Sequence, residues 1–98
     1  MEVEFRTDAL ARLESDPSAR ADLPPEVVRA YQKRIYSIRA AQDERDLYAI
    51  KSHRFKKLAG DRAHQRSMRL NDQWRLILEL RSSGGRTSIL VSEIEDYH

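Results

Sequence analysis

The chain has no cysteine among its 98 residues, which excludes a disulfide framework and a thiolate metal site. It also has no apolar run near the roughly 20 residues that a membrane-spanning helix needs. Its first residues show neither the basic start nor the apolar stretch of a signal peptide. We therefore expect a cytoplasmic protein that makes no membrane contact.

No internal repeat or low-complexity segment divides the chain. A chain of this length buries only about two-thirds of the surface that its unfolded form exposes, so its core is modest. We expect one domain over residues 1–98.

Acidic side chains are scarce in one segment. The formal net charge is only +2, but its distribution is uneven, because residues 1–50 hold ten acidic and eight basic side chains. Residues 51–75 hold only two acidic side chains, Asp61 and Asp72. The basic side chains of that segment are Lys51, Arg54, Lys56, Lys57, Arg62, Arg66, Arg69 and Arg75. This asymmetry favours a polyanionic partner for one face, and a solvated basic face is the simpler alternative.

The N-terminal residues predict a strand and then a short helix. Residues 2–6 alternate polar and apolar side chains, which is typical of a strand. Thr7 or Asp8 is a suitable N-cap for the helix that follows. A polar loop is expected over residues 15–22.

A longer helix is predicted over residues 25–41. Pro25 suits its first turn, where a missing N–H costs nothing. Its apolar face is formed by Val28, Tyr31, Ile35 and Ile38. Tyr36, like Tyr31, is expected to pack in the interior. The acidic run at residues 43–46 is expected to end the helix.

Strands dominate the C-terminal half. They are predicted at residues 54–58, 66–70, 74–80 and 89–94. A tight turn at residues 71–72 and a hairpin loop at residues 82–85 connect the last three. The order of elements predicts an α+β domain, in which a mainly antiparallel sheet carries helices on one face.

Side-chain alternation assigns the strand residues to two faces of the sheet. Met68 and Leu70 are expected to face the core, and Arg66, Ser67 and Arg69 to be more exposed. The core-facing side chains of the next strand would be Trp74, Leu76, Leu78 and Leu80. Its open face would carry Arg75, Ile77 and Glu79. A guanidinium on a rigid strand suits a phosphate, so Arg75 is a candidate ligand, with a solvent-facing arginine as the alternative.

Three titratable side chains, Asp96, Tyr97 and His98, follow the last predicted strand. A histidine has an ordinary pKa of about 6.5, so His98 is a candidate general acid or base that Asp96 would orient. A frayed terminus is the alternative. His53 and His64 are predicted to be structural or solvated, and the spacing of the histidines predicts no metal site.

The residues from Leu58 to Ile77 read L-A-G-D-R-A-H-Q-R-S-M-R-L-N-D-Q-W-R-L-I, and the last three read D-Y-H. This pattern resembles the HigB-like toxins of bacterial toxin–antitoxin modules, within the RelE/ParE superfamily. The L-P-P-E helix start and the spacing of the first apolar residues agree with it. The resemblance implies a small curved sheet with two N-terminal helices packed on one face.

The same resemblance implies a toxin that enters the ribosomal A site and cleaves mRNA there. Its active-site residues would be Arg75, Asp96, Tyr97 and His98. Two positions depart from the family pattern: a common lysine is Ala59 here, and a histidine of some members is Lys56. We expect Lys56 or Lys57 to supply the missing cation, and we assign Lys56 to the catalytic site. The remaining cations expected to bind RNA or the ribosome are Lys51, Arg54, Lys57, Arg62, Arg66 and Arg69.

We expect no metal and no cofactor, since no carboxylate cluster is typical of a magnesium site. A ribose 2′-OH would attack its adjacent phosphate, with His98 or Asp96 assisting proton transfer. Arg75 and Lys56 would offset the charge that develops on the phosphoryl oxygens. Tyr97 would stack on a base or donate a hydrogen bond to an oxygen.

The expected partners are a cognate helix-turn-helix antitoxin similar to HigA, the 70S ribosome and mRNA. Operator DNA would be contacted only through the antitoxin. Two alternatives stay open at this point. One is a ParE-like toxin that inhibits DNA gyrase without catalysis, and the other is an inactive module that binds RNA or the ribosome through its basic face alone.

Overall fold

The computed structural model describes residues 1–19 and 22–96. Along this part of the chain the elements are β1 (Glu2–Phe5), α1 (Asp8–Ser15), α2 (Pro25–Ala40), α3 (Glu44–Ala49), β2 (Lys56–Lys57), β3 (Gln65–Arg69), β4 (Trp74–Ser83) and β5 (Arg86–Asp96). Short 3-10 turns lie at Pro17–Ala19, Lys51–His53 and Gly60–Arg62. None of the helices formed by these described residues is long and apolar enough to cross a membrane.

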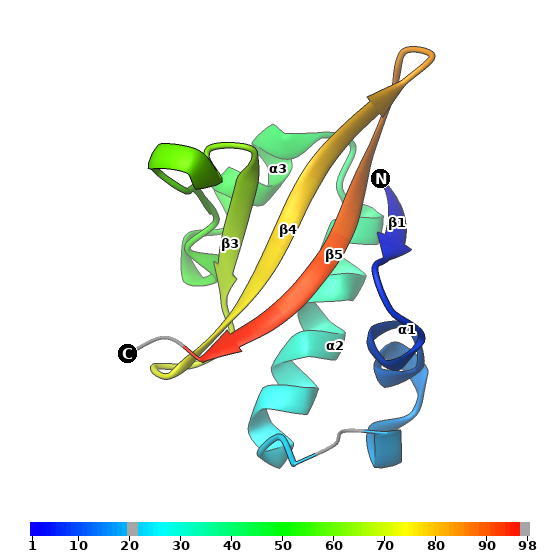
Figure 1. Cartoon of the computed structure of the whole chain (residues 1–98), viewed down its shortest axis with the longest axis vertical. Coiled ribbons are helices and arrows are strands. Elements are labelled where there is room, and N and C mark those ends of the chain that lie inside the picture. The colour runs from blue at the N-terminus through cyan, green and yellow to red at the C-terminus, as the bar shows by residue number, and fades with distance from the viewer. Residues whose placement is uncertain (20–21, 97–98) are drawn as a thin grey trace.

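The strands form one mixed sheet in the order β1-β5-β4-β3-β2. β1 runs parallel to β5, and the other neighbours are antiparallel. In Figure 1, β4 and β5 form a long, twisted ribbon in front of α2. α1 packs against α2 and β1. The predicted α+β fold, with its mainly antiparallel sheet, is confirmed.

The core lies between α2 and the covered face of the sheet. The apolar stripe predicted on the long helix is buried in full, including Tyr31. It meets an apolar layer of strand side chains formed by Met68, Leu76, Leu78, Ile89 and Val91. The hydroxyl of Tyr31 donates a hydrogen bond to the carbonyl of Leu10, at 2.6 Å, and so joins α1 to α2. Each large buried side chain stabilises the fold by about 1.5–3 kcal/mol, so this layer dominates folding.

Two helix starts follow local capping chemistry. The hydroxyl of Thr7 accepts a hydrogen bond from the backbone N–H of Leu10, so Thr7 caps α1 as predicted. Asp43 caps α3 by accepting from the backbone N–H of Arg45, at 2.9 Å. The prediction that the acidic run only ends a helix was therefore wrong, because α2 has already ended at Ala40 and the run begins α3.

Three other expectations were wrong in detail. The strand predicted at residues 54–58 shortens to Lys56–Lys57, and at its start Arg54 has a left-handed backbone that a strand does not allow. Tyr36 is 76% exposed on the outer side of α2 instead of packing in the interior. Ser67 is only 2% exposed, although it lies on the open face, because neighbouring segments cover it.

The β4–β5 hairpin is longer than predicted, because β4 continues to Ser83. Its turn is reduced to Gly84 and Gly85, and both have positive φ angles, of 57° and 81°. Two positive φ values in succession match the twist of an antiparallel hairpin, and glycine adopts them without a steric cost.

A β-bulge interrupts the pairing of β4 with β5. Glu93 pairs with Ile77 and Val91 pairs with Leu78, so Ser92 is an extra residue in β5. An extra residue reverses the alternation of side chains beyond it.

The bulge decides where Glu95 lies. Without the extra residue, Glu95 would share the covered face with Val91, because the two are four positions apart. With it, Glu95 pairs with Arg75 and lies on the open face. The bulge is held by Arg6, whose Nε donates to the hydroxyl of Ser92, at 3.1 Å.

Candidate active site on the open face of the sheet

The open face of the sheet carries charged side chains around an apolar centre. Cross-strand register places Lys56, Ser67, Ile77 and Glu93 in one row, and Arg69, Arg75 and Glu95 in the next. Ile77 is fully buried but does not belong to the core cluster under α2. Arg62 reaches over this face from its 3-10 turn, where it contacts Gln65 and Glu95.

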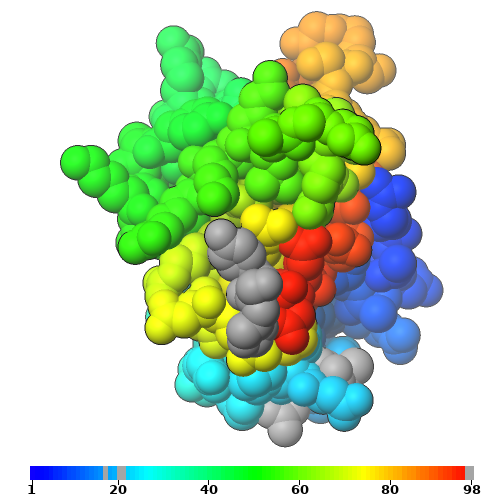
Figure 2. All heavy atoms as spheres, turned by 60° about the vertical axis from the view of Figure 1, so that its left-hand side comes forward, coloured from blue at the N-terminus to red at the C-terminus, as the bar shows by residue number. Residues whose placement is uncertain are grey.

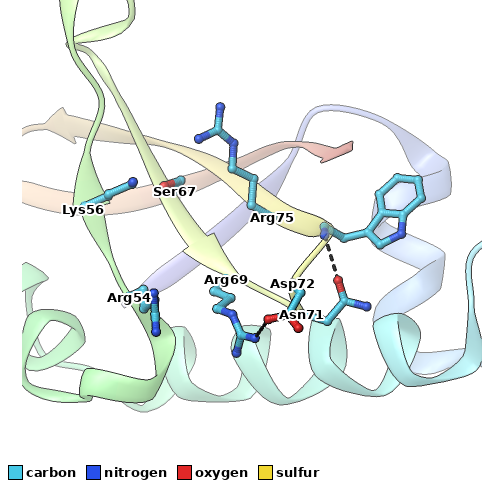
Figure 3. A pocket seen from close by; sticks show the side chains of 8 residues that line it. Arg54, Lys56, Ser67, Arg69, Asn71, Asp72 and Arg75 are labelled. Carbon is cyan, nitrogen blue, oxygen red and sulfur yellow. Dashed lines mark hydrogen bonds and ion pairs between the residues drawn. The ribbon is translucent and has the colours of Figure 1, made fainter. Parts of the chain in front are cut away.

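A cavity of about 190 Å³ opens on this face. Its lining residues are Arg54, Lys56, Ser67, Arg69, Asn71, Asp72, Trp74 and Arg75. Four of them are cations and one is acidic. Figure 3 shows Lys56, Ser67 and Arg75 along the strands, with Arg54 and Arg69 between them and α2. In Figure 2 the green and yellow segments that supply these residues lie together on one face, beside the red end of β5.

Arg75 is positioned by an ion pair. Its Nε donates to one carboxylate oxygen of Glu95, and the other oxygen of Glu95 lies 3.2 Å from Arg62. The Arg75 side chain is only 17% exposed, so this pair is well shielded from solvent. The contact uses Nε, the guanidinium nitrogen nearest the side-chain stem. It therefore fixes the orientation of the Arg75 guanidinium at the cavity wall.

The loop between β3 and β4 forms one rim of the cavity. The side-chain oxygen of Asn71 accepts hydrogen bonds from the backbone N–H groups of Gln73 and Trp74, each at 2.8 Å. This local bonding is typical of asparagine in turns. Asp72 at the same rim pairs with Arg69. Arg69, at the end of β3, is therefore a cavity cation that is already neutralised in part.

Arg54 enters the cavity from the opposite side. It follows the 3-10 turn Lys51–His53 and has a left-handed backbone, with φ of 46°. That conformation is uncommon for a residue with a side chain. It reverses the chain after the turn, so that Arg54 and Lys56 both line the cavity.

The predicted cations divide between different surfaces. Lys51 is exposed on its turn, and Lys57 lies next to Lys56 on a strand, so its side chain points to the other face. Arg66 lies on the helix side, where its Nε contacts Glu44 of α3 at 2.6 Å. Arg62 contacts Glu95. Only Arg54, Lys56, Arg69 and Arg75 line the cavity.

Asp96 does not line the cavity, and it accepts a hydrogen bond from the side chain of Gln73, at 3.3 Å. Tyr97 and His98 lie outside the described residues. Their predicted roles stay predictions.

Sequence reasoning missed Ser67 as a cavity residue and recognised Asn71 and Asp72 only as a turn. Ser67 lies two positions before Arg69, so strand alternation alone placed it on the open face. Its register partner across the sheet is Lys56, which comes from a separate strand. Alternation along one strand does not reveal what the folded chain places beside a residue, so the burial of Ser67 could not be predicted.

Two solved toxin structures have a similar fold. A YoeB/ParE toxin from Agrobacterium tumefaciens has a TM-score of 0.57 and 15% identity, with 100% of both chains covered. YafQ from E. coli strain BL21(DE3) has a TM-score of 0.56 and 10% identity, with 97% of this chain and 91% of that chain covered. No curated protein sequence matches the chain well enough to count as a relative. The fold is therefore that of a small RelE/ParE-type toxin.

The sequence makes the assignment more specific. The family described as the RelE-like toxin of the type II toxin–antitoxin system HigB matches residues 3–98. Because this match covers nearly the whole chain, the protein belongs to the HigB-like toxin family. A type II toxin is one half of a pair, which implies an antitoxin partner.

Proposed function

We propose that this toxin is a ribosome-dependent endoribonuclease that cleaves mRNA in the ribosomal A site and so inhibits translation. The observation that supports it is the cavity on the open face. Four cations and a buried serine line it, and the one carboxylate among the lining residues is paired with Arg69. Such a site attracts a phosphate group and stabilises extra negative charge on it.

The reaction would be an in-line attack within the RNA. The ribose 2′ oxygen forms a bond to phosphorus while the bond from phosphorus to the 5′ oxygen breaks. One proton leaves the 2′ oxygen and one is given to the 5′ oxygen, so the products carry a 2′,3′-cyclic phosphate and a 5′-hydroxyl. Arg75 and Lys56 would stabilise the charge that develops on the phosphoryl oxygens.

Proton transfer would fall to His98 or Asp96, and Tyr97 would stack on a base or donate to an oxygen. Asp96 lies at the end of β5, directly after the Glu95 that positions Arg75. The described part of β5 therefore ends beside the residue that positions Arg75. This is why we keep His98 as the leading candidate for the general acid or base.

The ribosome would supply the alignment of the substrate. Orientation of reacting groups contributes roughly 7–11 kcal/mol of a barrier. The purified toxin should therefore leave naked RNA intact and cut only messages that are being translated. Efficient cleavage of free RNA by a nuclease-free preparation would refute ribosome dependence.

The deciding experiment maps mRNA 5′ ends after induced expression and measures the supercoiling of a reporter plasmid in parallel. New 5′-hydroxyl ends inside coding sequences, with normal supercoiling, are expected. Deletion of His98 should lower cleavage about 10²–10⁴-fold, the usual contribution of general acid–base catalysis. Ribosome co-sedimentation should be nearly unchanged in that variant. Altered supercoiling without new ends would favour inhibition of DNA gyrase instead.

A further inference from the structure

A second hollow lies on the outer side of α2. Three cations, Arg29, Lys33 and Arg34, line it together with Tyr36 and His53, and none of its lining residues is acidic. The expected function makes no use of it, since all the cations assigned above come from residues 51–75.

Arg34 is anchored by a backbone carbonyl and by no carboxylate of the described residues. Its Nε donates to the backbone carbonyl of Arg69, at 3.0 Å. No carboxylate pairs with it within residues 1–19 or 22–96. Burial, followed by the charge of Arg69, lowers the pKa of Arg34. A half-buried guanidinium in this position would gain from an anion supplied by another molecule.

His53 adds a buried donor or acceptor to the same hollow. The residue is only 5% exposed, and its Nδ1 has no hydrogen-bond partner among the described residues. A buried polar nitrogen is ordinarily paired, and leaving it unpaired is costly. Burial and then the charge of Arg34 lower the pKa of His53, which favours the neutral imidazole. His53 therefore adds an unpaired polar group to the wall of the hollow.

Tyr36 supplies an exposed aromatic surface beside these groups. It was expected in the core, yet it is the most exposed large hydrophobic side chain in the described part of the protein. Stacking on an aromatic ring is the main way in which proteins hold an unpaired RNA base.

We propose that this hollow binds a nucleotide of ribosome-associated RNA outside the cleavage site. Arg34, with Lys33 or Arg29, would hold a phosphate, and Tyr36 would stack on a base. The proposal rests on the proposed function, because it takes RNA to be the ligand of the neighbouring cavity.

Continuity with that cavity favours RNA over an acidic protein segment. Arg69 lines the cavity with its side chain and holds Arg34 with its carbonyl group. His53 lines the hollow, and the next residue, Arg54, lines the cavity. An RNA strand bound in the cavity would therefore meet further cations between the cavity and the hollow. An acidic protein segment would match the charge, but it would leave the exposed ring of Tyr36 without a stacking partner.

The test measures binding of the full chain to 70S ribosomes carrying a message, by co-sedimentation over a series of salt concentrations. The double variant Arg29→Gln/Lys33→Gln should bind more weakly. Its slope of log affinity against log salt should be shallower by up to about 0.7, because the hollow holds one phosphate and each phosphate contact on a single strand contributes about 0.7. Arg81→Gln, which removes a cation near the far tip of the β4–β5 hairpin, is the matched control and should bind like the parent protein.

Tyr36 is tested with a matched pair. Tyr36→Leu should lower ribosome affinity about fivefold or more, whereas Tyr36→Phe should retain it, because stacking needs the ring and not the hydroxyl. Single-turnover cleavage at saturating toxin should be unchanged in both. If the double variant and Tyr36→Leu bind ribosomes with unaltered affinity and salt slope, the inference is wrong.

The outcomes also separate this inference from the proposed function. If the parent protein cuts no translated message, the proposed function fails, while the binding data still decide the role of the hollow. Affinity for the co-expressed antitoxin is measured on the same variants. If that affinity falls while ribosome binding is retained, the hollow is a docking site for an acidic protein segment, and the RNA proposal is overturned.

Discussion

The two faces of the sheet have opposite chemistry although they share the same strands. Leu76 and Leu78 of β4 lie in an apolar layer under α2, while Arg75, on the other side of the same strand, lies among charges. Alternation of side chains along one strand therefore separates the residues that stabilise the fold from those that form the charged surface. One face stabilises the fold, and the other presents cations.

The contacts on the two faces also differ in how much they stabilise the fold. Buried apolar side chains contribute about 1.5–3 kcal/mol each, whereas exposed ion pairs contribute about 0–1 kcal/mol. Most ion pairs of the described chain have at least one partner with substantial exposure, such as Arg6 and Asp72. Substitutions on the covered face should therefore affect folding, and those on the open face should affect activity.

The largest expected effect is on stability. Leu76→Ala removes a fully buried side chain from the layer under α2. The free energy of unfolding should fall by about 2–5 kcal/mol, from lost burial and from the cavity that remains. Urea unfolding followed by circular dichroism measures this change. A loss below about 1 kcal/mol would mean that the covered face does not dominate folding as argued.

The second prediction concerns the opposite face of the same strand. Arg75→Ala should lower single-turnover cleavage of a translated message roughly 10²–10³-fold, the usual effect of losing one donor to a developing negative charge. Its urea midpoint should change far less than that of Leu76→Ala. The comparison breaks if Arg75→Ala unfolds the protein, or if it cleaves at the parent rate.

The third prediction separates two arginines of β3. Arg69→Gln should weaken ribosome binding and make its salt slope shallower by about 0.7, because this residue lines the cavity. Arg66→Gln should instead lower the free energy of unfolding by about 1 kcal/mol, because it breaks the contact with Glu44 on the helix side. Equal losses of ribosome affinity in both variants would contradict this division.

The smallest expected effect is a dependence of stability on pH. In the folded protein the pKa of His53 lies below about 6.5, which is its ordinary value in the unfolded chain. At a pH between these two pKa values, the unfolded chain binds a proton at His53 and the folded chain does not. The free energy of unfolding should therefore decrease as the pH falls through about 6.5. His53→Gln should flatten this decrease, and His64→Gln, in an exposed turn, is the control. A decrease of the same size in all three proteins would show that His53 does not cause it.

Much of the fold could be predicted because its signals are local. The apolar stripe on residues 25–41 and the alternation in β3 and β4 both produced elements where expected. The miss at Tyr36 has a physical reason, because this residue lies one position beyond Ile35 on the helix and hence outside the buried stripe. Asp43 was misjudged because an acidic run after a helix is equally suited to capping the next one.

The candidate site could be predicted only in part. Lys56, Arg69 and Arg75 were chosen for their charge and strand position, and the cavity does bring them together. Arg66 was chosen for the same reasons, but it alternates to the helix side. Asn71 and Asp72 entered the site through the shape of a loop, which depends on hydrogen bonds that composition does not reveal.

Spacing along the chain was enough to predict the class of the protein, most of its helices and strands, and which residues of β4 face the core. The tertiary structure alone decided that Glu95 meets Arg75. The bulge at Ser92 reverses the alternation of side chains in β5. A bulge is defined only by the pairing of one strand with another, here of β5 with β4. It also decided that Arg34 and His53 adjoin the cavity, since α2 and the turn before Arg54 meet only after folding. Contacts between segments distant in sequence leave no periodic signal, so only the folded chain reveals them.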